Sequence, residues 1–434
     1  MIQKNDKRKI LMLLILSLLL VIPVCSETSV SVAAPTPIWS DQTGVHDILV
    51  QCSNDGWYVV SGSDTGILRM YDQNGTALWS FRRDGQVVRS VAISGKGDYV
   101  GAVFLSMDVP SHYAGGAAFV FNRNGSEVWN YTRDYTVEHI AMSDDGDTIY
   151  VSGSPNLYSF ALNGTLVGRN ESDGRTWVLR AASNGSFAMA GGTIIDKIHM
   201  EGYNLWSDQI VLIERNGTIP WKYPTRQHIN SIGISADMTT IATAARYQFS
   251  SFIRNGTLMW QLNSDPDIFS VAVSSDGGYT AVGTEFYTGL YNRSGSVLWK
   301  YKSSPGIRSV GISGDGNVIV SGGSTGIYVL NRTGTLLWYY RTPKSVSHVS
   351  VSGDGTYFVA STSDTTYFFN RWGNLTIYPP EIMPEPAPNA STRDPERING
   401  SMNPQHPASV DTPILIIGGI CAVAVVFTIR RRNS

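Results

Sequence analysis

Cysteine is scarce in this chain, and its scarcity excludes several kinds of chemistry. The 434 residues contain only Cys25, Cys52 and Cys421, which lie far apart in the sequence. They form neither a vicinal Cys-Cys pair nor a Cys-x-x-Cys-His haem motif. Since Cys25 and Cys421 fall in apolar terminal segments, Cys52 is the one cysteine expected outside a membrane, and no intramolecular disulfide framework can form there. We therefore expect packing to hold the core, as it can in a domain of this size.

Charged residues are also few, and no catalytic motif stands out. Asp, Glu, Lys and Arg make up 16% of the chain, and the formal net charge is −2. The chain has no basic stripe that could follow a nucleic-acid backbone, so we expect no nucleic-acid partner. The spacing supports no Ser/His/Asp or Cys/His grouping and no phosphate-binding glycine loop. We therefore predict no catalytic residues, no cofactor and no metal ligands, and we expect that the protein is not an enzyme.

The chain does contain eight copies of one short pattern. In each copy an apolar alternation leads into a first tight turn, usually Ser-x-Asp-Gly, and the last residues of these turns are Gly56, Gly97, Gly146, Gly185, Met238, Gly277, Gly316 and Gly355. Two further apolar runs, a second turn and an aromatic-ended run follow. Four short strands in a repeat of about 40 residues are typical of a β-propeller blade. The pattern predicts an all-β, eight-bladed β-propeller over residues 35–378.

A tryptophan marks the fourth strand of most copies and suggests how the ring closes. Six copies place it four residues after the second-turn glycine, as Trp79, Trp129, Trp221, Trp260, Trp299 and Trp338. Copy three has Gly168 there, and copy eight has Ile377. An isolated fourth-strand fragment at residues 37–40 precedes copy one and contains Trp39. We predict that this N-terminal strand joins the eighth blade, supplies its missing tryptophan and leaves the ring without free ends.

The segment at residues 330–338 resembles the tryptophan-docking motif of pyrroloquinoline-quinone-type propeller repeats. That motif runs acidic residue, two spacers, Thr-Gly, three spacers, Trp. The spacing from Gly334 to Trp338 matches, whereas Asn331 stands one residue closer to the Thr-Gly pair. The resemblance covers residues 35–378 and implies eight blades, with each tryptophan packed between neighbouring blades. Because the family's quinone enzymes carry a vicinal cysteine pair that is missing here, the resemblance implies its non-enzymatic scaffold branch.

The polar residues of the repeats are interpreted as structural. A first-turn aspartate recurs in many copies, whereas an active site occurs once per ring, so we predict that Asp55, Asp276, Asp315 and Asp354 cap their turns. The Asp-Asp-Gly-Asp run at residues 144–147 is interpreted as a solvated turn rather than a calcium loop. His139 and His348 occupy matching first-strand positions and are predicted to be structural. The Asn-Gly second turns of five copies favour two-residue hairpins.

Two copies are longer than the rest, and their insertions are the predicted binding loops. The insertions cover residues 105–117 and 193–208, both between a second and a third strand. Insertions of single repeats often mark a binding face. Aromatic and charged side chains in them are typical of contact surfaces, although such loops can also fold over their own blade. The predicted partner-binding residues are Asp108, His112, Tyr113, Tyr203, Trp206 and Asp208.

Both ends of the chain carry membrane signals. Residues 1–34 have a basic start and an apolar run, which predicts a cleaved secretory signal, with an uncleaved anchor as the alternative. Residues 379–412 are rich in proline and predict a semi-rigid stalk. Residues 413–429 predict a short transmembrane helix, and the arginines in the tail at 430–434 place the C-terminus in the cytoplasm. The layout also resembles some prokaryotic C-terminal sorting signals. We expect a single-pass cell-surface protein with its propeller outside.

Asn-x-Ser/Thr sites are numerous, but many coincide with the Asn-Gly turns. Sites outside those turns are stronger candidates for glycosylation, and they are Asn130, Asn170, Asn389 and Asn399. Taken together, the sequence predicts a membrane-anchored extracellular propeller that binds a protein or polysaccharide as a scaffold of the cell envelope. The alternative is a quinoprotein-like or glycoside-acting enzyme with a site at the propeller axis. A third interpretation is an assembly scaffold for envelope proteins.

Overall fold

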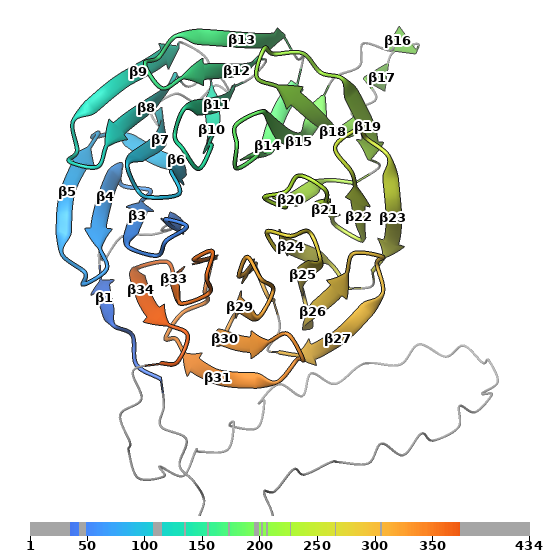
Figure 1. The fold of residues 1–434 in the computed structure, drawn as a ribbon. Coiled ribbons are helices and arrows are strands. Elements are labelled where there is room, and N and C mark those ends of the chain that lie inside the picture. The colour runs from blue at the N-terminus through green and yellow to red at the C-terminus, as the bar shows by residue number, and fades with distance from the viewer. Residues whose placement is uncertain are drawn as a thin grey trace, which may run out of the picture. The chain divides into compact units, whose positions relative to one another are not determined.

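A computed structural model describes most of the region that holds the repeats. The described residues are 35–42, 49–106, 115–133, 136–153, 156–171, 174–194, 199–200, 203–204, 207–225, 227–264, 266–303 and 306–373. Within these ranges the chain forms strands and no helix. Eight antiparallel four-stranded sheets follow one another around a central axis (Figure 1). The predicted eight-bladed β-propeller is therefore confirmed.

The strands of the first four blades follow the chain in order, from the axis outward. Blade 1 contains β2 (Leu49–Cys52), β3 (Tyr58–Gly62), β4 (Ile67–Asp72) and β5 (Ala77–Arg82). Blade 2 contains β6 (Gln86–Ile93), β7 (Tyr99–Ser106), β8 (Gly116–Asn122) and β9 (Glu127–Arg133). Blade 3 contains β10 (Val137–Met142), β11 (Thr148–Gly153), β12 (Asn156–Ala161) and β13 (Leu166–Glu171). Blade 4 contains β14 (Gly174–Ala181), β15 (Phe187–Ile194), β18 (Ser207–Glu214) and β19 (Trp221–Thr225).

The other four blades continue this order until the ring closes. Blade 5 contains β20 (Ile229–Ile234), β21 (Ile241–Ala245), β22 (Gln248–Phe252) and β23 (Leu258–Asn263). Blade 6 contains β24 (Ile268–Val273), β25 (Tyr279–Thr284), β26 (Tyr287–Asn292) and β27 (Val297–Lys302). Blade 7 contains β28 (Ser309–Ile312), β29 (Val318–Gly322), β30 (Gly326–Asn331) and β31 (Leu336–Arg341). Blade 8 contains β32 (His348–Val351), β33 (Tyr357–Ser361), β34 (Thr365–Asn370) and β1 (Trp39–Gln42).

The ring closes through its first strand. β1 pairs antiparallel with β34, and Trp39 lies opposite Phe368. The Trp39 ring also stacks on Phe368 at 5.4 Å and on Tyr71 of blade 1 at 5.1 Å between centroids. The prediction that the N-terminal strand completes the eighth blade is confirmed, and the two ends of the repeat region are joined by packing as well as by backbone hydrogen bonds.

Each fourth-strand tryptophan joins its blade to the next. Its indole N–H donates to a backbone carbonyl in the second turn of the following blade, and the acceptors for Trp39, Trp79, Trp129, Trp221, Trp260, Trp299 and Trp338 are Gln73, Arg123, Leu162, Arg254, Arg293, Arg332 and Arg371. Blade 3 lacks a tryptophan because the blade 4 turn lies directly against Gly168. A Cβ there would approach the Gly217 nitrogen to 2.3 Å.

The second turns are not the predicted two-residue hairpins. In blade 1, Gly75 N–H donates to the Asp72 carbonyl, and Asp72 N–H donates to the Thr76 carbonyl. Gly75 has a φ of 86°, whereas Asn74 does not have a positive φ. This is a three-residue loop that ends in a left-handed glycine. The Asp72 carboxylate stabilises this loop by accepting the Asn74 and Thr76 amides at 2.9 and 2.8 Å. The neighbouring blade also requires glycine here, because a Cβ on Gly75 would lie 2.6 Å from the Trp39 ring.

The first turns are capped by their own side chains. In blade 7, Ser313 donates to Asp315 at 2.6 Å, while Asp315 accepts the Asn317 amide and Ser313 accepts the Val318 amide. Asp55, Asp145, Asp237, Asp276 and Asp354 have the same serine contact in their blades. The predicted capping role is confirmed. All eight last residues of these turns have positive φ, including Met238 at 61°, the one non-glycine residue with positive φ in the described part of the chain.

The apolar core is divided among the interfaces between neighbouring blades. Eight clusters of buried residues each combine side chains of two neighbouring blades. Between blades 1 and 2, for example, Leu68 packs with Phe104 and Phe119. Between blades 8 and 1, Val59 and Tyr71 pack with Phe368. Because every blade is buried on two sides, the ring presents two open faces and an outer rim to solvent.

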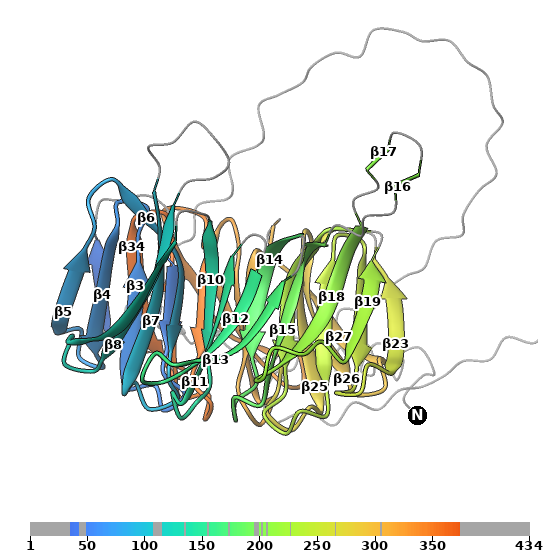
Figure 2. The same cartoon turned by 90° about the horizontal axis from the view of Figure 1, so that it is seen from above.

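The two faces differ in what they carry. Strand direction alternates, so the first and second turns of all blades lie on one face, which we call the turn face. The connections between second and third strands and between blades lie on the other, which we call the insertion face. The strands that flank both predicted insertions, β7 and β8 and also β15 and β18, are joined on this face. The short hairpin of β16 (His199–Met200) and β17 (Tyr203–Asn204) lies beyond β15 and β18 (Figure 2).

Candidate functional site

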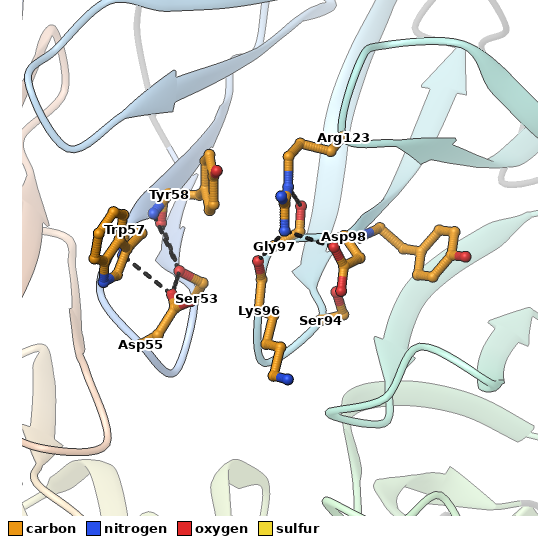
Figure 3. Close-up of polar contacts among 10 residues, drawn as sticks. Ser53, Asp55, Trp57, Tyr58, Ser94, Lys96, Gly97, Asp98 and Arg123 are labelled. Carbon is orange, nitrogen blue, oxygen red and sulfur yellow. Dashed lines mark hydrogen bonds and ion pairs between the residues drawn. The ribbon is translucent and has the colours of Figure 1, made fainter.

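The turn face is built from contacts that repeat, which gives it a structural role. Arg123 of blade 2 donates to the Lys96 carbonyl at 2.8 Å and to Asp98, and its guanidinium lies 4.6 Å from the Tyr58 ring centroid of blade 1 (Figure 3). Arg332 repeats this clamp on Tyr279, and Arg254 stacks on Phe187. A feature found in several blades stabilises the joints between blades and is not expected to recognise one ligand.

The insertion face differs from blade to blade, and blades 4 to 6 form a connected surface on it. At the start of β18, Asp208 lies 3.4 Å from Nδ1 of His228, measured at Oδ2. The His228 ring in turn meets the edge of Trp177 of β14, with centroids 4.8 Å apart. Asp208 is 14% exposed and His228 is 48% exposed, so the carboxylate is held beneath a histidine that faces solvent.

The connection between β21 and β22 extends this surface. The Tyr247 amide donates to the Gln227 side chain at 2.6 Å, and the Arg246 amide donates to the His228 carbonyl. The Arg246 guanidinium donates to Asp267 at 3.0 Å and lies 5.0 Å from the centroid of the Tyr247 ring. The hydrogen bond to Asp267 raises the pKa of Arg246 above its ordinary value. These contacts fix the direction of two exposed side chains.

Backbone hydrogen bonds connect this surface to blade 6. The Glu285 amide donates to the Asp267 carbonyl, and the Ile268 amide donates to the Arg246 carbonyl. Phe286 follows in the turn between β25 and β26 and is 50% exposed, while Tyr247 is 39% exposed. We call this set the blade 4–6 surface, and its members are Asp208, His228, Arg246, Tyr247, Asp267 and Phe286.

The composition of the blade 4–6 surface suits macromolecular contact. It combines two exposed aromatic rings, an arginine and two partly buried carboxylates on pre-ordered backbone. Aromatic residues and arginine are the side chains most enriched at protein interfaces and their hot spots. Among the described residues no group of three metal-ligating side chains lies close enough to hold an ion. Two hollows of about 470 Å³ each are lined by turn residues such as Asp98 and Asp147 and lie apart from this surface.

The structure places one predicted binding residue on this surface. Asp208 belongs to it, and Tyr203 lies in β17 of the same insertion. Asp108, His112, Tyr113 and Trp206 lie outside the described residues. The sequence reasoning missed Trp177, His228, Arg246, Tyr247, Asp267 and Phe286. Their signal was weak, because each is a single departure from the repeat at a blade junction or a short turn rather than part of an insertion.

The other predicted sites are placed in part. Asn130 is exposed in β9, where its amide donates to Glu127, and Asn170 is partly buried in β13. Asn389, Asn399, the secretory signal, the stalk and the transmembrane helix lie outside the described residues. In the described part of the chain, no helix is long and apolar enough to cross a membrane. Cys52 is a free, buried thiol 3.3 Å from the Ser350 hydroxyl.

Comparison with known proteins identifies the repeats. Residues 249–381 match the PQQ_2 family model, which is described as outer membrane protein assembly factor BamB. Within this range the repeats are of the PQQ-like β-propeller type. The propeller is also similar to the solved C-terminal WD40 domain of Sif2, with a TM-score of 0.61 and 12% identity over 78% of this chain and 98% of that one. At such low identity the likeness concerns the fold alone. No curated protein matches the chain.

Proposed function

We propose that this protein is a non-enzymatic binding propeller whose blade 4–6 surface contacts a protein partner. The observation that carries the proposal is the connected set of exposed aromatic and charged side chains on the face that differs between blades. Tyr247, Phe286 and Arg246 are presented by backbone that is already hydrogen-bonded, so little ordering entropy opposes binding. The family description, which names an assembly factor, supports a scaffold role of this kind.

We place this propeller outside the cell on a membrane anchor. The support is the sequence pattern of a secretory signal, a proline-rich stalk, an apolar segment at residues 413–429 and a basic tail. Protease added to intact cells should then digest the stalk and release the ring. Protection of the stalk until the cells are opened would contradict this location.

Site-specific photocrosslinking in the full-length protein tests the binding face. A photoreactive phenylalanine analogue at position 247 or 286 should capture one partner in native cells, and the adduct should disappear after protease treatment of the partner. The matched control carries the analogue at position 57, because Trp57 is 58% exposed on the turn face. Capture from position 57 alone would place the contact on the turn face and would contradict the proposal. An adduct sensitive to glycosidase but not to protease would show that the partner is a polysaccharide rather than a protein.

The alternative, an enzyme with a site at the propeller axis, makes a different prediction. Its activity would survive substitution of Tyr247 and Phe286, because both belong to turns on the insertion face. A binding surface predicts the reverse, in which the partner is lost while the fold is kept.

A further inference from the structure

Three exposed arginines lie on or beside the strands nearest the axis. They are Arg89 in β6, Arg180 in β14 and Arg308, which immediately precedes β28. β6, β14 and β28 each pair with one strand of their own sheet, so the other edge of each strand faces the axis (Figure 1). Neighbouring blades cover both faces of each sheet, so an exposed side chain on these strands reaches solvent on the axial side of its blade rather than on the outer rim.

Arg180 departs sharply from the repeat. The equivalent residues of the other blades are small or uncharged, and they are Gln51, Ala92, Ala141, Gly233, Ala272, Gly311 and Ser350. Gly233 and Gly311 have no room for a side chain, since an added Cβ would lie 3.0 and 2.6 Å from a valine of the next blade. Blade 4 instead places a long cation at this level of the axis.

The Arg180 side chain is both exposed to solvent and close to protein. Its side chain is exposed to solvent, yet burial by surrounding protein lowers the pKa of its guanidinium from the ordinary value. The exposed guanidinium therefore lies close to surrounding protein, where a charge interacts more strongly than on an open surface.

No carboxylate neutralises these arginines within the described residues. Arg180 donates one hydrogen bond, to the carbonyl of Leu179, and neither Arg89 nor Arg308 has an ion pair there. Arginines elsewhere in the ring do have partners, as Arg69 pairs with Asp41 and Arg246 with Asp267. An enclosed cation without a counter-charge is unfavourable for folding alone. The fold therefore gives no structural reason for Arg180.

Two further arginines lie nearer the insertion face. Arg89 and Arg308 occupy equivalent positions three residues before the level of Arg180, or about 10 Å away along the strand, whereas blade 3 has Glu138 there, with a side chain that is only 2% exposed. An anion that approaches from the insertion face would pass Arg89 and Arg308 and meet Arg180 last.

We propose that the axial channel binds a small polyanion, a molecule with more than one carboxylate or phosphate group, and that Arg180 is the deepest of three guanidinium contacts. Guanidinium groups bind both kinds of anion through paired N–H donors. The site uses none of the residues of the blade 4–6 surface, so the two proposals can fail independently. The partner contact would survive loss of the anion site, and anion binding would survive loss of the partner contact.

Calorimetric titration of the full-length protein with citrate and with pyrophosphate tests the site. These probes separate a carboxylate ligand from a phosphate ligand. Arg180→Gln is expected to weaken binding of the preferred probe about tenfold or more, and added salt should weaken binding to the unaltered protein. Glutamine is compatible with the fold at this position because blade 1 has Gln51 there. The matched control is Arg82→Gln, which removes the same charge from the outer strand β5 and should leave binding unchanged.

Two further variants keep the proposal open to refutation. Arg89→Asn and Arg308→Ser replace each arginine by the residue of an equivalent position, Asn230 or Ser347, and the double variant should also bind more weakly. Thermal unfolding without ligand separates binding from a structural role, since Arg180→Gln should not lower the melting temperature. Absence of binding by either probe, equal binding by the Arg180→Gln protein, or a marked loss of unliganded stability in that variant would overturn the proposal.

Discussion

The indole N–H of Trp39 donates to the carbonyl of Gln73 at 3.2 Å, and this bond joins the last blade of the ring to the first. In the sequence, the first three strands of blade 1 lie between the two residues. They meet because β1 completes blade 8. The same bond occurs at six other blade junctions, so closure uses the ordinary joint of the ring with a strand from the opposite end of the repeat region.

Replacement of Trp39 by alanine should destabilise the propeller. The change removes this hydrogen bond and the stacking on Phe368 and Tyr71, and large-to-small substitutions of packed aromatics typically cost about 3–5 kcal/mol, with less expected here because Trp39 is only half-buried. The measurement is the free energy of unfolding in urea. Trp57→Ala is the control, since that ring is 58% exposed and its loss should change stability by less than about 0.5 kcal/mol. Equal effects of the two changes would contradict the joint described here.

The fold was predictable because its signals repeat. Turn residues, strand alternation and tryptophan spacing recur in eight copies, and the position of Met238 could be read from its neighbours although it is not glycine. Its φ of 61° shows that the backbone of the repeat overrides the preference of this one residue. The second turn was mispredicted for a physical reason, since the Asp72 side chain holds a three-residue loop by accepting the Asn74 and Thr76 amides, and the Asn-Gly pair alone does not show these bonds.

Residues of the candidate site were predictable only where one repeat is longer than the others. An insertion is visible in an alignment of repeats, and it led to Asp208. Arg246, Asp267 and Phe286 occur in connections of ordinary length, and their proximity depends on the ring bringing three successive blades together. Arg180 could have been singled out from the sequence, because it is the one charged residue among eight equivalent first-strand positions.

Two glycines with the same backbone conformation should respond differently to alanine. Gly306 has a φ of 76° and nothing within 4 Å of an added Cβ, so Gly306→Ala should cost only the conformational strain of about 1–2 kcal/mol. Gly316 has a φ of 69°, and an added Cβ would lie 2.5 Å from the Tyr279 ring. Gly316→Ala should therefore cost about 1–3 kcal/mol more, through overpacking. Urea unfolding of both variants gives the difference, and equal losses would show that Tyr279 can move aside.

The capped first turns should make the propeller sensitive to acid. Burial alone would raise the pKa of Asp315, but hydrogen bonds from Ser313 and Asn317 and the nearby Arg332 together lower it below the ordinary value, and the pKa of Asp354 is also lowered. A carboxyl group with a lowered folded pKa contributes stability above its unfolded pKa of about 3.9 and loses it as pH falls through the folded pKa. Asp315→Asn should therefore be less stable than the unaltered protein at pH 7, and this gap should narrow below about pH 4. Unfolding curves at pH 7, 4 and 3 measure it, and a gap independent of pH would refute the electrostatic role.

Cys52 should react with alkylating reagents only after the ring opens. Desolvation by burial raises the pKa of its thiol to about 11, so the reactive thiolate is rare at pH 8, and the side chain is 6% exposed. Peptide mapping after iodoacetamide treatment should show little modification of Cys52 in native protein and full modification in denaturant. Rapid labelling of the folded protein would indicate that blades 8 and 1 separate at the closing joint.

Loss of the two exposed rings of the blade 4–6 surface should separate binding from folding. Tyr247→Ser together with Phe286→Ser removes aromatic area that is 39% and 50% exposed, so the free energy of unfolding should change by less than about 1 kcal/mol. Partner capture by the full-length protein should nevertheless fall at least tenfold, as expected when hot-spot aromatics are removed. The matched control is Trp57→Ser with Trp372→Ser, which removes two rings of 58% and 56% exposure from the turn face. If that control abolishes capture while the first pair retains it, the recognition face is the turn face, and the repeated clamps there must be reconsidered as a binding surface.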